Sequence, residues 1–241
     1  MNENCIVAKN LMKSFGKRKV VDNLSFNVRK GEVFGLLGHN GAGKSTTIDL
    51  ILGLKKTDEG KAEILGMDAF ENRKAVFEKV GVQLQQTRYQ SNITVEEACI
   101  EYGSLYKEAA DYDGLLHQFG MEKMKKSMVS KLSGGERQKL SIILALIGNP
   151  EIVFLDELTT GLDVEARREV WRILKQLKNK GLTIFLTTHY MEEAEALCDH
   201  LCIIKSGEKV TEGTVADVIK NSGQKNLEDA YLFYMGEEVE L

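Results

Sequence analysis

The chain has 241 residues, of which 43% are hydrophobic and 28% are charged, a balance typical of a folded globular domain. Its formal net charge is −4, which argues against the basic surface expected of a nucleic-acid-binding protein. The longest apolar runs are too short to span a membrane, and the first residues lack a secretory signal. We therefore expect one domain exposed to the cytosol, with no nucleic acid as a partner.

The first part of the chain predicts an antiparallel sheet and then a buried strand. Residues 5–37 alternate apolar and polar side chains, with turns expected at 14–19 and 29–32. Val33–Leu37 is continuously apolar, as a strand buried on both faces should be. The next helix is expected over residues 44–52.

The middle of the chain, residues 94–147, predicts a mostly helical insertion, because it is too long for a plain crossover between strands. Two capping boxes support helix starts there, at Thr94 with Glu97 and at Ser133 with Glu136. In each box the hydroxyl accepts a backbone N–H, while the carboxylate reaches back to the cap residue.

Later buried runs predict further strands that alternate with helices, which indicates a parallel sheet flanked by helices. The expected strands are residues 152–155, 183–187 and 201–204. The expected helices are residues 164–178, capped by Asp163, and residues 191–198.

The four cysteines form no Cys-x-x-Cys pair and no cluster with histidine. In a reducing compartment this pattern indicates four buried or half-buried thiols, and a disulfide or metal site is the alternative. The basic run at residues 123–126 is interpreted as a solvated helix face. The cysteines are Cys5, Cys99, Cys198 and Cys202.

The most informative motif is a glycine-rich loop that follows a predicted strand and opens a predicted helix. Its glycines let backbone N–H groups approach phosphate oxygens, and the helix N-terminus adds partial positive charge. Lys44 can reach the β and γ phosphates of ATP, and the Ser45 hydroxyl can ligate Mg²⁺. The alternative is an ordinary glycine-rich turn. The loop reads Gly38, His39, Asn40, Gly41, Ala42, Gly43, Lys44, Ser45, Thr46.

Hydrolytic chemistry is predicted where two other strands end. Asp156 and Glu157 follow a buried strand, where Asp156 can hold Mg²⁺ through water and Glu157 can polarise an attacking water. His189 follows another strand, where a neutral imidazole could contact the γ-phosphate. The alternatives are a surface acidic pair and a structural histidine.

A second glycine turn has the form of another phosphate site. Ser133, Gly134 and Gly135 combine a hydroxyl with bare backbone at a helix start, although the motif by itself is weak. Two such turns with one set of hydrolytic residues suggest that two copies of the chain cooperate on each nucleotide.

These motifs, in this order and spacing, resemble those of the nucleotide-binding ATPase subunit of ATP-binding cassette (ABC) transporters over nearly the whole chain. The resemblance implies an α/β fold: a P-loop NTPase (RecA-like) core, an N-terminal antiparallel β subdomain and an inserted helical subdomain. The implied subdomains are 1–93 with 148–225 for the core, 94–147 for the insertion, and 226–241 for a C-terminal tail. The motifs that carry it are residues 38–46, 132–138, 156–157, 161–163 and 187–189.

The resemblance also implies site residues that the motifs alone do not. Phe15 falls where the family stacks an aromatic ring on adenine, and the alternative is a core aromatic. Gln85 aligns with the glutamine that contacts Mg²⁺ and water, although Gln83 and Gln86 leave its register open. Asp163 belongs to the loop that faces the nucleotide. Each ATP would touch residues 38–46 of one chain and 133–135 of the other, with Mg²⁺ near Ser45, Gln85 and Asp156.

Three positions depart from the family pattern. Leu158 and Val164 stand where the family usually or often has proline, which removes no catalytic group. Glu136 stands where many members have glutamine, and its side chain can cap the helix. We expect function to survive all three changes.

The C-terminal residues 226–234 resemble the tail of cassettes that serve type-2 exporters, and the alternative is a plain amphipathic helix. The expected function is ATP hydrolysis that drives a separately encoded membrane permease, with the chain held at the inner face of the cell membrane. The competing classes are a soluble ABC ATPase of translation or DNA repair and a regulatory nucleotide-binding module with little turnover.

Overall fold

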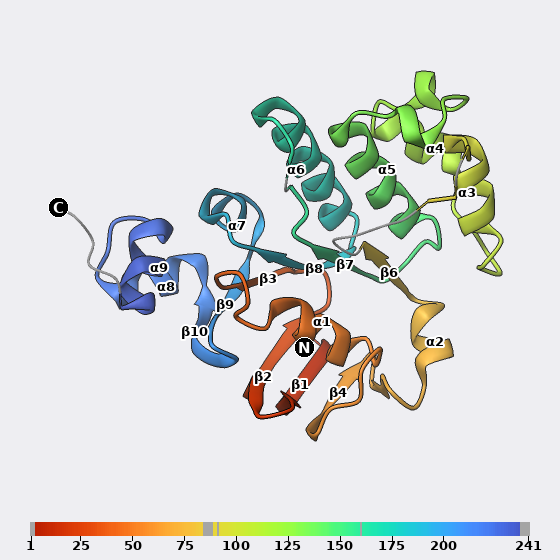
Figure 1. Ribbon diagram of the computed structural model, residues 1–241. Helices are drawn as coiled ribbons and strands as arrows, with labels where there is room; N and C mark the ends of the chain where they lie inside the picture. The colour runs from red at the N-terminus through yellow and green to blue at the C-terminus, as the bar shows by residue number, and fades with distance from the viewer. Residues whose placement is uncertain (1–2, 84–88, 91, 160, 237–241) are drawn as a thin grey trace. The chain divides into compact units, whose positions relative to one another are not determined.

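The computed structural model describes four stretches of the chain, residues 3–83, 89–90, 92–159 and 161–236. The chain divides into two units: one combines Met1–Val76 with Phe185–Leu241, and the other is Phe77–Ile184. The chain leaves the first unit at α2 (Arg73–Phe77) and returns to it along β8 (Thr183–Thr188) (Figure 1). Gln85 and Gln86 lie outside the described residues.

An antiparallel sheet begins the first unit, with strand order β2-β1-β4-β5. The alternating segment predicted from the sequence forms its first two strands, and the turn expected near residues 14–19 joins them. The other two strands were not predicted, because their sequences are short and largely polar. The strands are β1 (Asn4–Phe15), β2 (Arg18–Arg29), β4 (Glu59–Ile64) and β5 (Met67–Asp68).

A second sheet in the first unit has the order β10-β9-β3-β8. The fully buried β3 (Val33–Leu37) turns away from the antiparallel sheet and pairs in parallel with β9 (His200–Lys205). The edge strand β10 (Glu208–Thr214) pairs antiparallel with β9. The predicted parallel sheet is thus confirmed, with one antiparallel edge strand.

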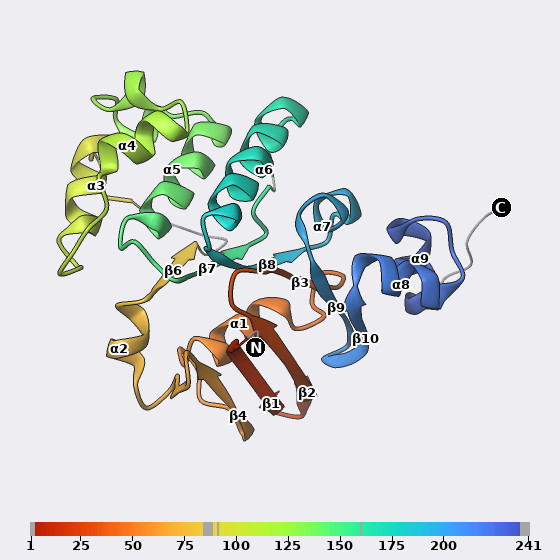
Figure 2. The ribbon, with the colours of Figure 1, turned by 180° about the vertical axis from the view of Figure 1, so that it is seen from behind.

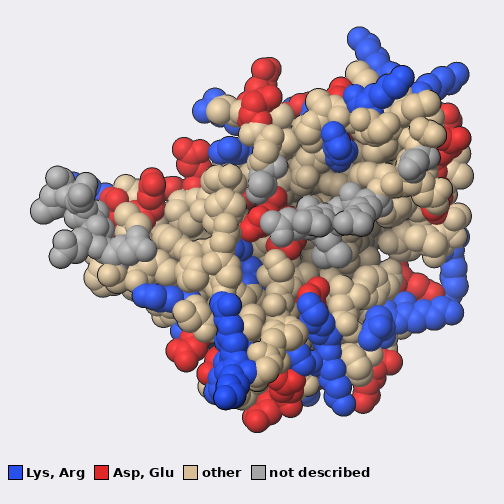
Figure 3. Space-filling view, in the orientation of Figure 1, with Lys and Arg blue, Asp and Glu red and all other residues tan. Residues whose placement is uncertain are grey.

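The helix α1 (Lys44–Ile51) lies between these two sheets (Figures 1 and 2). Three stacked phenylalanine rings connect the two sheets. The ring centroid of Phe26 on β2 lies 5.1 Å from that of Phe34 on β3 and 6.0 Å from that of Phe185 on β8. All three rings are buried, so their stacking fixes how β2 meets the inner strands. Lysine and arginine side chains stand out over β2 and β4 (Figure 3).

The C-terminal helices close one end of the first unit. Thr214 caps α8 (Val215–Ser222) and Asn226 caps α9 (Leu227–Met235). Lys205 Nζ donates a hydrogen bond to the carbonyl of Met235, which ties α9 to β9. Together with α7 (Met191–Leu197) these helices bury one apolar cluster, so α9, which holds most of residues 226–234, packs on the core. The cluster comprises Leu37, Ala194, Leu201, Ile203, Val218, Leu227 and Met235.

The second unit joins a pair of parallel strands to a group of helices. The strand β6 (Val80–Gln83) pairs with β7 (Ile152–Asp156). At Gly81 a Cβ atom would lie 1.8 Å from the carbonyl oxygen of Ala145, so only glycine lets α5 approach β6 this closely. The helical segments are α3 (Val95–Gly103), α4 (Tyr112–Gln118), η1 (Glu122–Met124), η2 (Val129–Lys131), α5 (Gly134–Leu146) and α6 (Val164–Asn179).

The predicted helical character of residues 94–147 is therefore confirmed, as are both capping boxes. None of the helices within the described stretches combines the length and the apolar character needed to cross a bilayer.

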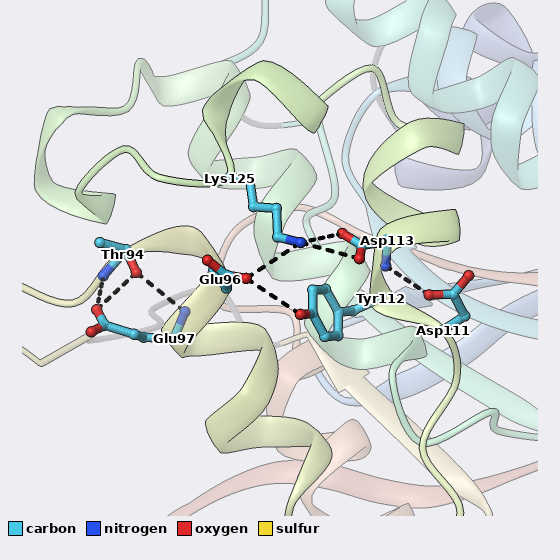
Figure 4. Close-up of polar contacts among 7 residues, drawn as sticks. All are labelled: Thr94, Glu96, Glu97, Asp111, Tyr112, Asp113 and Lys125. Carbon is cyan, nitrogen blue, oxygen red and sulfur yellow. Dashed lines mark hydrogen bonds and ion pairs between the residues drawn. The ribbon is translucent and has the colours of Figure 1, made fainter.

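Lys125 joins three segments of this insertion (Figure 4). Its ammonium lies 2.8 Å from the carboxylate of Asp113 on α4 and 3.3 Å from that of Glu96 on α3. The hydrogen bond to Asp113 raises the pKa of Lys125 above its ordinary value. Interpreting residues 123–126 as a solvated face is thus wrong for Lys125, while Lys123 and Lys126 are exposed.

All four cysteines are free thiols: Cys5, Cys99 and Cys202 are buried and Cys198 is half-buried. Burial raises the pKa of the Cys99 thiol to about 11. These positions agree with the structural role predicted for the cysteines.

Candidate functional site

The phosphate-binding loop lies between β3 and α1 in the first unit, the setting that the motif requires. Gly41 and Gly43 adopt left-handed φ angles of 82° and 107°. A Cβ atom at Gly43 would lie 2.5 Å from the carbonyl oxygen of Val20, and one at Gly38 would lie 2.7 Å from that of Ile204. The loop therefore needs glycine for both its conformation and its close packing.

The ammonium of Lys44 is folded back into this loop. Its side chain is buried, and Nζ donates to the carbonyls of Gly38 at 2.8 Å and His39 at 3.2 Å. The amide of Ala42 donates to the carbonyl of His39, which tightens the turn. The cation is thus held inside the loop, where it can face phosphate oxygens.

The remaining loop residues surround this lysine. His39, Asn40 and Ser45 are exposed, and His39 Nδ1 lies 2.8 Å from the carbonyl oxygen of Asn40. Thr46 is half-buried and Ala42 is buried. Gly43 is the N-cap of α1, and the helix has no side-chain cap and no acidic residue in its first turn, so its N-terminus stays open to an anion.

Phe15 lies in the first unit at the end of β1, with 48% of its surface exposed. The Nζ atoms of Lys13 and Lys55 lie 5.9 and 5.7 Å from the ring centroid. The alternative of a core aromatic is therefore wrong. The exposed ring is able to stack on a planar ligand.

His189 follows β8 and is half-buried. Its ring centroid lies 4.2 Å from that of Tyr190, whose amide donates to the Thr188 hydroxyl at 2.9 Å. These contacts fix the turn that carries the imidazole.

The two predicted carboxylates lie in the second unit. Asp156 ends β7 and is 3% exposed, and its backbone carbonyl accepts a hydrogen bond of 3.5 Å from Gln83 Nε2. Glu157 follows in a left-handed conformation with φ of 51°, which is unfavourable for a residue with a side chain. Such backbone strain is common at functional sites, and nothing in the residue type predicted it.

The signature turn starts α5 in the second unit. The Ser133 hydroxyl accepts the amide of Glu136 at 3.2 Å, and the Glu136 carboxylate accepts the amide of Ser133 at 2.8 Å. The backbone hydrogen bond from Ser133 lowers the pKa of Glu136. Within the described part of the chain, the amides of Gly134 and Gly135 have no acceptor. Two N–H donors and a hydroxyl are thus presented at an exposed helix start.

The loop after β7 packs against this turn. Gln138 Nε2 donates to the carbonyl of Leu158 at 2.6 Å, and Leu158 itself is buried. Asp163 accepts the amide of Ala166 at 2.8 Å and so caps α6, as predicted. Leucine at position 158 therefore fills a core position in the turn that follows Glu157.

Two contacts were missed by the sequence reasoning. Gln138 supports the loop after Glu157, although its spacing within the signature gave no reason to expect this contact. Arg18 Nη2 lies 3.5 Å from the carbonyl oxygen of Gly41, inside the phosphate-binding loop. The position of Arg18 at the far side of the turn from Phe15 was the only available signal.

The Ser45 hydroxyl, in the first unit, and the Asp156 carboxylate, in the second unit, are each an oxygen donor of the type that Mg²⁺ prefers. Among the described residues, no group of three or more His, Cys, Asp or Glu side chains forms a metal cage.

Comparisons with known proteins agree with these motifs. The ABC transporter family model matches residues 21–160. The Nod factor export ATP-binding protein I of Paraburkholderia xenovorans (strain LB400) is 39% identical over 224 residues, which cover 91% of this chain and 74% of that protein.

Solved structures show the same fold. A structure of an ATP binding subunit of an ABC transporter has a TM-score of 0.88 and 28% identity, over 96% of this chain and 99% of that one. A dimeric ATP-binding cassette in a post-hydrolysis state, bound to ADP and Pi, has a TM-score of 0.77 and 26% identity, over 87% of this chain and 98% of that one. The chain therefore belongs to the ABC transporter family, as a P-loop cassette that binds and hydrolyses ATP.

Proposed function

We propose that two copies of this chain enclose two ATP molecules and power a separate membrane permease that exports its substrate. The observation that carries the proposal is the phosphate-binding loop, in which Lys44 is held among backbone carbonyls at the open N-terminus of α1. The export direction is supported by the relatives, which are named as Nod factor export ATP-binding proteins.

The first unit holds most of the nucleotide. Phe15 stacks on adenine, residues 38–46 bind the phosphates, and Lys44 neutralises charge on the β and γ phosphates. His189 contacts the γ-phosphate and responds to its loss. This role is supported by the contacts of Tyr190, which hold the turn after β8 and so restrict the position of the His189 ring.

The second unit supplies the hydrolytic groups. Glu157 accepts a proton from the attacking water, and its strained backbone is held by the buried Leu158. Ser45, Asp156 and Gln85 would hold Mg²⁺, which supplies charge neutralisation on the phosphates when bound. Asp156 is buried, which restricts the motion of its carboxylate.

The second copy completes each site. The Gly134 and Gly135 amides and the Ser133 hydroxyl donate to the γ-phosphate of the ATP bound by the other copy, and Asp163 belongs to the adjoining loop. The open amides support this assignment, as does the dimeric state of a solved relative. One copy alone should bind ATP but hydrolyse it poorly.

The permease is the expected membrane partner, and it holds the chain at the membrane. We propose that residues 94–147 and the glutamine-bearing segment before them transmit closure of the dimer to it. The tie made by Lys125 supports this, because it joins α3 and α4 into one body (Figure 4). Affinity purification of the tagged chain from native membranes should recover a polytopic membrane protein.

The proposal is tested by Glu157→Gln, which keeps the side-chain shape and removes the base. Turnover should fall by at least about 100-fold, while ATP stays bound and traps a dimer. Phosphate release measures the first effect, and light scattering with ATP and Mg²⁺ measures the second. Glu228→Gln, an exposed carboxylate on α9, is the control and should behave as wild type. A variant that stays monomeric with ATP would overturn the shared-site model.

A further inference from the structure

The hairpin that carries Phe15 also carries an arginine whose contacts the motifs do not explain. Arg18 is exposed, and its guanidinium reaches the phosphate-binding loop, where Nη2 lies 3.5 Å from the carbonyl oxygen of Gly41. At this length the hydrogen bond is weak. A stronger acceptor could therefore replace the Gly41 carbonyl as the partner of the guanidinium at a small cost in free energy.

The strand register places this arginine on the same face as the adenine platform. Phe15 and Arg18 are directly opposite each other across β1 and β2, and opposed residues of an antiparallel pair project to the same face. The Phe15 ring is exposed on that face. One short hairpin thus presents an aromatic ring and a cation that already reaches the phosphate-binding loop.

Arg18 differs from three nearby lysines in its ion pairing. Lys13 pairs with Asp58 at 2.7 Å, Lys19 with Asp22 at 3.0 Å, and Lys55 with Asp49 at 2.6 Å. In the part of the chain that the structure describes, Arg18 pairs with no carboxylate. Arg18 therefore reaches the loop with no carboxylate partner among the described residues, and a guanidinium fork matches phosphate oxygens well.

We infer that Arg18 is a nucleotide-binding residue, whose guanidinium leaves the Gly41 carbonyl and binds the phosphate chain of ATP or ADP. This inference rests on the proposed placement of adenine on Phe15. With the base on that ring, Arg18 lies at the hairpin side of the phosphates, and Lys44 lies inside the loop. The phosphates are then held by cations from two segments of the chain.

The test compares Arg18→Gln with Lys17→Gln, which removes another exposed charge one residue away. Arg18→Gln should lower the affinities for ATP and for ADP by about tenfold each, as expected for the loss of one charge-assisted hydrogen bond. Lys17→Gln should change either affinity less than twofold. Calorimetric titration gives the nucleotide affinities, and equal melting temperatures show that all variants are folded.

Adenosine separates a phosphate contact from a structural role. Its affinity, measured by competition with a fluorescent ADP, should be unchanged in Arg18→Gln and reduced about tenfold in Phe15→Ala. Equal losses for adenosine and ATP in Arg18→Gln would show that Arg18 only supports the hairpin, and would overturn the inference. Arg18→Lys should recover part of the ATP affinity, because it keeps the charge without the fork.

ATP binding by the chain and phosphate binding by Arg18 can be refuted separately. A wild-type chain that binds neither ATP nor ADP would overturn the proposed function and this assignment with it. Wild-type binding of ATP, together with an Arg18→Gln variant that matches Lys17→Gln, would overturn the assignment of Arg18 alone.

Discussion

The two glycine turns of this chain both open a helix, but they differ in what already occupies the helix start. At α1 there is no side-chain cap and no acid in the first turn. At α5 the hydroxyl of Ser133 and the carboxylate of Glu136 form a complete capping box. The first turn is therefore open to an anion. At the second turn the Glu136 carboxylate already occupies the helix start, and it would repel an approaching phosphate.

Under the proposed function, this difference accounts for why the first turn binds ATP within one copy, whereas the second turn acts only on ATP held by another copy. Lys44 adds a buried cation beside the first turn, and Glu136 adds a charge of the opposite sign beside the second. Binding at the second turn rests on the two glycine amides and a hydroxyl. It should therefore need a phosphate that the first turn of another copy already holds in place.

The largest effect is expected when the first turn loses its cation. Lys44→Ala should weaken ATP binding by about 3 kcal/mol, roughly 100-fold, because charge-assisted hydrogen bonds to two phosphates are lost. Calorimetric titration with ATP measures the effect, and Lys61→Ala on β4, an exposed lysine paired with Glu63, is the control. Unchanged affinity for ATP would refute the role of Lys44.

A smaller effect is expected at the second turn. Ser133→Ala removes the cap of α5 and should destabilise the fold by about 1 kcal/mol in urea denaturation. ATP-dependent dimerisation should weaken by about tenfold, since a donor to the γ-phosphate is lost, while ATP binding by one copy is unchanged.

Thr94→Ala is the matched control for that variant, because it removes the same type of capping box from α3. It should cost similar stability and leave dimerisation unaltered. Equal weakening of the dimer in both variants would assign the effect of Ser133→Ala to general loss of structure.

The smallest effect concerns the charge of Glu136. Glu136→Gln keeps an oxygen that can accept the amide of Ser133 but removes the negative charge from the helix start. The fold should lose about 0.5 kcal/mol, and ATP-dependent dimerisation should tighten about twofold. Glu97→Gln, at the corresponding position of the α3 box, should lose similar stability without the gain in dimerisation.

The stability loss should also depend on pH. The pKa of Glu136 is lowered in the folded chain from its ordinary value of 4.5, so the ionised carboxylate stabilises the fold above that value. The contribution disappears as pH falls from 4.5 through the lower folded pKa. Denaturation of wild type and Glu136→Gln should therefore differ at pH 7 and converge at low pH, and a constant difference would contradict this account.

The sequence predicted well those elements whose signals are local. The apolar runs of β3, β7 and β8 and the two capping boxes were located from residue type and spacing alone. The short β6 was missed, because a four-residue strand beside a glutamine-rich loop has no periodicity of its own. The polar β4 was missed for a similar reason: its stability comes from pairing with β1.

The candidate site was predictable to the level of residue identity and not beyond. The phosphate-binding loop, Asp156 and Glu157 follow from motifs, but the exposure of Phe15 and the pairing of Lys125 depend on contacts between distant segments. The reach of Arg18 to Gly41 likewise depends on how the first hairpin packs over the loop.

The left-handed backbone of Glu157 sets stability against activity at a single position. Glycine there would relieve about 1 kcal/mol of strain, and it would also delete the proposed base. Selection for a sturdier fold alone would therefore drive this position away from glutamate. If Glu157 is the base, as proposed, this position favours turnover at the expense of backbone stability.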